Sequence, residues 1–161
     1  LVAGAKGWKD YALQADVCHA YQILLKGGLK KENIIILMYD DIARNPRNPR
    51  PHQIFNSFDG PDVYSGIVPD YWGRDVNADT LWYVLSGGAL GVRPVRPGNV
   101  LNSGPTDTVF IFYSGHGSSG FLSMPQEPDI ADMKFRHALV WLYRKRKYAS
   151  MLVTRGLLFK E

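Results

Sequence analysis

A histidine between two glycines is the first feature of this sequence that could do chemistry. Gly115, His116 and Gly117 follow an apolar run within FIFYSGHGSSGF, residues 110–121. An imidazole gains and loses a proton near neutral pH, which suits general acid–base catalysis. A neighbouring glycine lets a backbone N–H approach a ligand closely, and such a group can donate to a developing oxyanion. The other interpretation is a histidine in a tight turn that bonds to backbone, and these residues alone leave both open.

The same glycines match the G-x-G-x-x-G pattern of a dinucleotide-binding turn, but their context does not. That fingerprint needs a helix directly after the turn, so that the pyrophosphate lies at the helix N-terminus. Here Pro125 and Pro128 stand where the helix would run. The Gly-Lys-Ser/Thr ending of a P-loop is absent, and the serines that follow do not fit a G-x-S-x-G nucleophile elbow. We therefore predict no nucleotide cofactor.

Cys18 is the only cysteine, which excludes an internal disulfide and a cysteine-rich metal site. It falls in a stretch where apolar residues recur at helical spacing, and its neighbour His19 is at i+1, which does not face it on a helix. The sequence therefore predicts that Cys18 is a small buried hydrophobe, and it predicts no metal site or other cofactor.

The first part of the chain reads as a strand, a helix and a second strand. Residues 1–4 are typical of the end of a buried strand whose beginning is missing, and residues 11–26 of a helix that Gly27 and Gly28 stop. Residues 33–41 contain a continuous apolar run with three β-branched isoleucines, the pattern of a strand buried on both faces. This order predicts a right-handed crossover between parallel strands.

The later elements continue the alternation. They are a long connection at 44–75, a short helix at 77–88 that begins near Asn77 or Asp79, a loop at 92–105, a strand at 107–115, an extended piece at 121–125, an amphipathic helix at 129–148 and a strand at 149–159 whose pattern is lost at Thr154, Arg155 and Gly156. Strands that alternate with helices predict an α/β fold, with sites beyond the carboxyl ends of the strands. His116 follows such an end.

Composition limits the partners of this chain. Its 161 residues suffice for one domain, and the net charge is +4 with a mean hydropathy of −0.19. No apolar run approaches the roughly 20 residues that span a bilayer, so no membrane segment is predicted. The basic clusters at 44–50, 93–96 and 144–147 lack interleaved aromatic residues, which favours solvated surfaces over nucleic-acid binding.

Several segments together resemble the legumain family of cysteine endopeptidases, also called asparaginyl endopeptidases or vacuolar processing enzymes. They are QADVCHAYQILLKGGLKKENIIILMYDDIA at 14–43, DVYSGIVPDY at 62–71, SGP at 103–105 and the HG of 116–117. NPRNPRP and GHG are more distantly similar to the catalytic subunit of GPI-anchor transamidase. The resemblance implies a caspase-like α/β fold, a mostly parallel sheet flanked by helices, here truncated after about four strands. It also implies peptide or protein substrates and a lysosomal, vacuolar or secretory location.

The resemblance also assigns roles to residues. It gives His116 the family's catalytic histidine and Gly117 the oxyanion-donating glycine. Asp10 stands where the family has an asparagine that orients the imidazole, and an aspartate adds a negative charge there. Ala12 and Leu13 stand where the family has an arginine and a histidine that line the substrate pocket. Because neither residue can make those polar contacts, cleavage after asparagine is not assured.

The sequence has no cysteine at the position that corresponds to the family's nucleophile. The family reads Glu-Ala-Cys-Glu-Ser-Gly after its fourth strand, and counting from Tyr148 places Leu158 at the cysteine. A leucine side chain cannot attack a carbonyl, so we expect the chain as written to be inactive. We interpret residues 1–161 as a single partial peptidase domain in which residues 154–161 are a non-homologous tail. The alternatives are a non-catalytic homologue that binds other molecules and a transamidase-like subunit.

Overall fold

The strand β2 (Thr108–Ser118) is the centre of the sheet, and the other strands are arranged around it. The computed structural model describes residues 1–91, 93–95 and 98–159. Within these residues β2 pairs in parallel with β1 (Val2–Ala3) on one side and with β5 (Ser150–Phe159) on the other. Two short antiparallel strands, β3 (Phe121–Leu122) and β4 (Ile130–Ala131), follow the end of β2.

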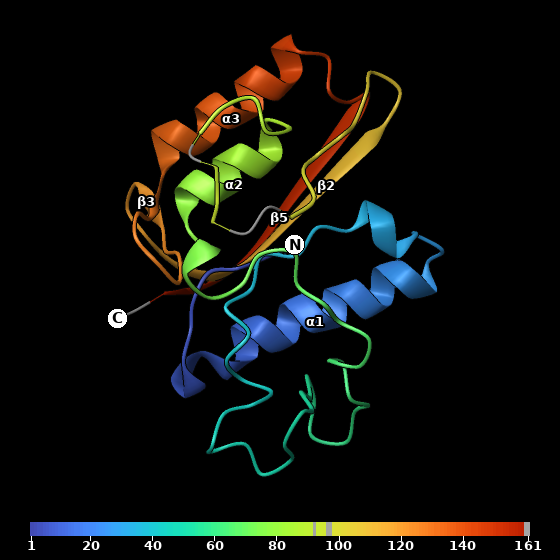
Figure 1. Ribbon diagram of the computed structural model, residues 1–161, viewed down its shortest axis with the longest axis vertical. Coiled ribbons are helices and arrows are strands. Elements are labelled where there is room, and N and C mark those ends of the chain that lie inside the picture. Colours follow the sequence, from blue (N-terminus) through green and yellow to red (C-terminus); the bar gives the residue numbers. More distant parts are fainter. Residues whose placement is uncertain (92, 96–97, 160–161) are drawn as a thin grey trace.

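Helices cover both faces of the sheet, as the α/β prediction requires. The helix α1 (Tyr11–Lys26) lies on one face, and α2 (Ala78–Leu85) and α3 (Asp132–Arg144) lie together on the other (Figure 1). Side chains of β2 alternate between them, since Ile111 and Tyr113 pack with α2 and α3 while Phe112 packs with the α1 layer. The mostly parallel, helix-flanked fold predicted from the sequence is confirmed.

Local signals placed most of the helices correctly. The predicted helix at 11–26 is α1, and Gly28 beyond its end adopts a φ of 90°. The side chain of Asn77 accepts a hydrogen bond from the Thr80 N–H at 2.9 Å and caps α2. Residues 129–131, expected in the last helix, instead contain β4, and α3 begins after it. Short 3₁₀ turns occur at Trp8–Asp10, Lys31–Asn33 and Gly73–Asp75.

The prediction of a full strand at 33–41 is wrong. The segment is buried as expected, but only Leu37 forms ladder bridges, to Val2 and to Tyr71. The Ile36 N–H bonds to the Asp70 carboxylate at 2.9 Å instead of to a strand partner. Asp40 then turns the chain away with a φ of 65°. An extended segment thus lies beside β1 without forming a regular strand.

Two predicted boundaries around β2 and β5 are also wrong. The strand β2 continues through Gly115 to Ser118. His116 therefore lies among the paired residues near the end of the strand and not after it. The strand β5 does not lose its structure at 154–156, because its parallel register to β2 runs unbroken from Ser150 to Phe159. Backbone hydrogen bonds hold this strand without an alternating apolar pattern, and its side chains at 152–156 are exposed.

The remaining segments agree with the loops that were predicted. Residues 44–72 contain no helix or regular strand, although an isolated bridge joins Phe55 to Asp62. The loop at 92–105 includes Val92, Arg96 and Pro97, which lie outside the described residues, as do Lys160 and Glu161 of the predicted tail. In the part of the chain that the structure describes, no helix is both long and apolar enough for a membrane span.

Replacement of Leu152 by lysine should reduce self-association of the chain. Leu152 is 57 % exposed on β5, and the described residues provide no strand beyond β5. Open strand edges with apolar side chains pair with other chains, and a lysine there opposes such pairing. Sedimentation velocity of L152K should show less oligomer than the unmodified chain. I23K is the control, since Ile23 is also 57 % exposed but lies on α1. Equal effects of both changes would contradict the role of the edge.

Candidate active site at the ends of β2 and α1

His116 and Asp10 lie in direct contact although 106 residues separate them in sequence. The imidazole Nε2 lies 2.7 Å from Asp10 Oδ1. His116 comes from the end of β2, and Asp10 ends the 3₁₀ turn that leads into α1. Their side chains are 16 % and 27 % exposed, so the pair is sheltered and still reachable from solvent. This contact can orient the ring and stabilise it when it is protonated.

A second polar contact fixes the same end of α1 to β2. The Ser114 hydroxyl donates to Asp16 Oδ2 at 2.8 Å, and Ser114 is 1 % exposed. A buried hydroxyl of this kind stabilises the fold only when it has such a partner. Ser114 and Asp16 were not predicted as site residues. The only sequence signal for Ser114 is a polar residue inside an apolar strand directly before the glycine and histidine.

The backbone on which His116 sits is held by a buried tyrosine. The Tyr113 hydroxyl donates to the carbonyl oxygens of His116, at 3.0 Å, and of Ser123, at 2.6 Å. Burial raises the pKa of Tyr113, so the hydroxyl stays protonated and remains a donor. A Cβ atom at Gly115 would overlap this hydroxyl, and one at Gly4 would do the same. Gly115 therefore makes room for the tyrosine that supports the histidine.

Gly117 borders a cavity that is lined by residues of β2, β3, α3 and β5. It pairs with Leu122 of β3, and the cavity of about 730 Å³ opens beside it. Ser118, Phe121 and Arg155 are among its lining residues. This volume lies within the usual range for ligand sites. The lining residues of this cavity do not include His116 or Asp10.

The other predicted positions do not take part in this contact. Ala12 is exposed on the first turn of α1, and Leu13 is 1 % exposed in the core. In the parallel register of β2 and β5, Leu158 stands opposite His116. Cys18 is completely buried, with its Sγ 3.9 Å from Met38 Sδ, and burial raises its thiol pKa. The prediction of a structural Cys18 is confirmed, because such a thiol does not form a reactive thiolate.

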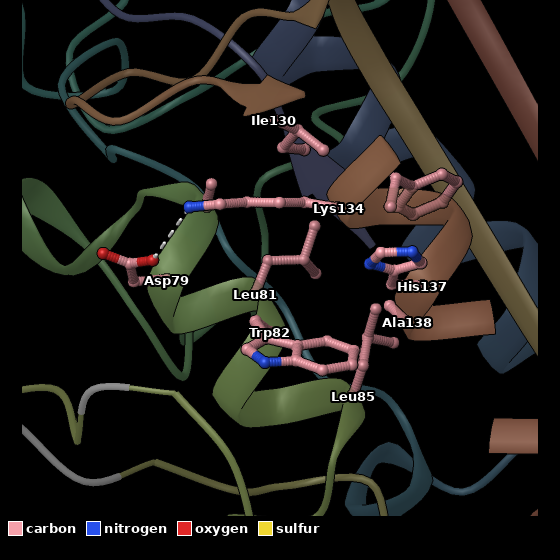
Figure 2. A pocket seen from close by; sticks show the side chains of 10 residues that line it. Asp79, Leu81, Trp82, Leu85, Ile130, Lys134, His137 and Ala138 are labelled. Atoms are coloured by element: carbon pink, nitrogen blue, oxygen red, sulfur yellow. Dashed lines mark ion pairs between the residues drawn. The ribbon is translucent and has the colours of Figure 1, made fainter. Parts of the chain in front are cut away.

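A smaller cavity of about 260 Å³ lies between α2 and α3 on the same face of the sheet. Figure 2 shows Lys134 extended toward Asp79, with their charged atoms 4.0 Å apart, over a floor that includes Leu81 and Trp82. Its lining residues come from α2, α3 and β4, and they do not include His116 or Asp10. No group of three or more potential metal ligands occurs among the described residues.

Comparison with known proteins gives a family match. The model of the Peptidase C13 family matches residues 1–154. Legumain from Canavalia ensiformis is 51 % identical over 150 residues, 93 % of this chain and 30 % of that protein. The vacuolar-processing enzyme delta-isozyme from Arabidopsis thaliana is 46 % identical over 95 % of this chain and 33 % of its own length, and human legumain is 42 % identical over 94 % and 35 %. The chain spans about a third of these relatives.

Replacement of Gly115 by alanine should destabilise the fold by about 1–3 kcal/mol, because the new methyl group displaces the Tyr113 hydroxyl. Gly156 is the matched control, since it pairs with Ser114 on the neighbouring strand and its Cβ would lie 3.7 Å from Ser114 Oγ, an ordinary contact. Urea denaturation of both variants measures the difference. A G115A variant as stable as G156A would contradict the packing argument.

Proposed function

The chain belongs to the Peptidase C13 family of cysteine endopeptidases, and we propose that His116 and Asp10 form the acid–base half of a peptidase active site. The observation that carries this proposal is the 2.7 Å contact between His116 Nε2 and Asp10 Oδ1 at the carboxyl end of a parallel strand. In this arrangement Asp10 orients the imidazole and stabilises its protonated form. The roles follow those of a nucleophile–histidine–carboxylate triad.

The proposed chemistry is hydrolysis of a peptide bond through a covalent thioester. With Nε2 held by Asp10, His116 takes the proton of a thiol nucleophile at Nδ1 and gives it to the amine that leaves as the thioester forms. His116 then takes a proton from the water that attacks the thioester and returns it to the departing thiolate. The Gly117 N–H donates to the oxyanion of the tetrahedral intermediate. Membership of a peptidase family supports a peptide or protein substrate.

We propose that the nucleophile of this half-site is not supplied by the chain as written. Leu158 stands opposite His116 in the sheet register and has no nucleophilic atom. Cys18, the only cysteine, is buried in α1 and unreactive. The family match to residues 1–154 supports our view that one caspase-like domain is present in part and that 154–161 depart from its pattern. The competing proposal is that the chain is a non-catalytic homologue, and the same residue, Leu158, supports it.

Specificity and location are proposed from the relatives. Several are named vacuolar-processing enzymes, which supports a vacuolar or lysosomal location. A preference for asparagine would have to come from residues other than Ala12 and Leu13. The methyl group of Ala12 and the buried Leu13 side chain offer no polar contact to an amide.

The test introduces a thiol at the position opposite His116. L158C should react with iodoacetamide at neutral pH roughly tenfold faster than L152C, because position 158 pairs with His116 in the sheet register and an imidazole near a thiol promotes thiolate formation. Leu152 is the matched control, since it is exposed on the same strand but pairs with Phe110. Mass spectrometry measures both rates.

The second part of the test is whether the labelling rate of L158C depends on His116. Adding H116A to L158C should remove the rate advantage, while adding it to L152C should change nothing. An L158C thiol that reacts no faster than L152C, or whose rate is insensitive to H116A, would contradict the proposed half-site.

A further inference from the structure

The carboxylate of Asp41 holds both ends of the short segment that carries Asp10. Its Oδ2 accepts a hydrogen bond from the Gly7 N–H at 2.8 Å, and its Oδ1 accepts one from Gln14 Nε2 at 2.7 Å. Gly7 precedes the 3₁₀ turn Trp8–Asp10, and Gln14 lies in the first turns of α1. One carboxylate from a distant loop therefore binds the chain both before and after Asp10.

Asp10 needs these contacts on both sides because its own side chain does not cap α1. It occupies the N-cap position of α1, where an aspartate normally accepts a backbone hydrogen bond from the first turn. Within the described part of the chain its side chain makes no capping bond, and it binds His116 instead. The preceding 3₁₀ turn also lacks a side-chain cap, and it begins after Gly7 at a φ of 89°. The helix start is thus held from outside.

The burial of the Gln14 amide is energetically unfavourable, and its hydrogen bond to Asp41 explains why an amide is present at this position. The residue is completely buried, and its Oε1 has no hydrogen-bond partner among the described residues. Burial of an unsatisfied amide oxygen is unfavourable, and an apolar residue of similar size would avoid it. Within the described residues, the one hydrogen bond of its side-chain amide is from Nε2 to the Asp41 carboxylate, and the negative charge of the acceptor makes this bond strong.

We propose that Asp41 is a positioning residue that keeps Asp10 in contact with His116. Among the described residues its carboxylate bonds to Gly7 and Gln14 and not to His116, so it acts through the backbone at Gly7 and through Gln14. This inference rests on the proposed function in that the Asp10–His116 pair is the part it serves. Displacement of a catalytic group by about 1 Å is enough to lower activity strongly, so a fixed helix start has a functional purpose.

The experiment follows the imidazole directly and needs no turnover. Long-range ¹H–¹⁵N NMR spectra of the full chain report which His116 nitrogen is hydrogen-bonded, and D10A gives the reference spectrum for a lost contact. In D41N the His116 Nε2 signal should move most of the way to its position in D10A. Q14L should move it in the same direction by less, because one of the two bonds remains. Since the unsatisfied Oε1 is removed as well, Q14L should keep its stability.

Asp70 provides the matched control. Its carboxylate also accepts one backbone N–H, from Ile36 at 2.9 Å, and one side-chain amide, from Asn99 Nδ2 at 2.8 Å. D70N and D41N should both lower the melting temperature by roughly 2–6 °C, while only D41N moves the His116 signal. An unchanged His116 signal in both D41N and Q14L would overturn the proposal. The readout stays valid if the L158C labelling fails, so the two proposals fail separately.

Discussion

The parallel pairing of β2 with its neighbours is the constraint on which the rest of the structure depends. β1 and β5 lie on opposite sides of β2 and run in the same direction, so their carboxyl ends meet at one edge of the sheet. The same edge receives the start of α1 through Asp10 and places Leu158 opposite His116. A peptide-backbone ladder thus determines which side chains can meet, and the chemistry at this edge follows from their identities.

Polar contacts then fix the helix that completes the half-site. Asp10, Gln14 and Asp16 lie at the N-terminal end of α1. Asp10 and Asp16 bond to residues of β2, and Gln14 bonds to Asp41 in a loop. Such partly buried bonds are worth more than surface contacts, and they are specific in geometry. The apolar remainder of α1 supplies burial, as Val17 and Cys18 show with no exposed area. Apolar packing therefore places the helix, and the polar contacts set its exact rotation and reach.

Local signals in the sequence are enough to predict the helices and to identify His116, but they do not show which segments pair with one another. Helical spacing and the glycines after it were enough for α1, and the Asn77 cap was enough for α2. The apolar pattern of residues 33–41 predicts a strand, because it does not reveal that Asp70 competes for the Ile36 N–H. The strand pattern of residues 149–159 is lost at 154–156 although β5 continues, because parallel pairing tolerates exposed polar residues such as Arg155. Asp41 and Ser114 were missed, although a carboxylate just after the MYD segment and a serine inside an apolar strand are visible signals.

The central proposal is that this chain keeps a histidine–carboxylate pair and lacks the nucleophile that the pair would activate. The most direct measurement is incubation of the purified 161-residue chain with asparagine-containing peptides, followed by mass spectrometry of the products. The account predicts no cleavage, because Leu158 stands opposite His116 and Cys18 is buried. Cleavage by the pure protein that a thiol-directed inhibitor abolishes would contradict it.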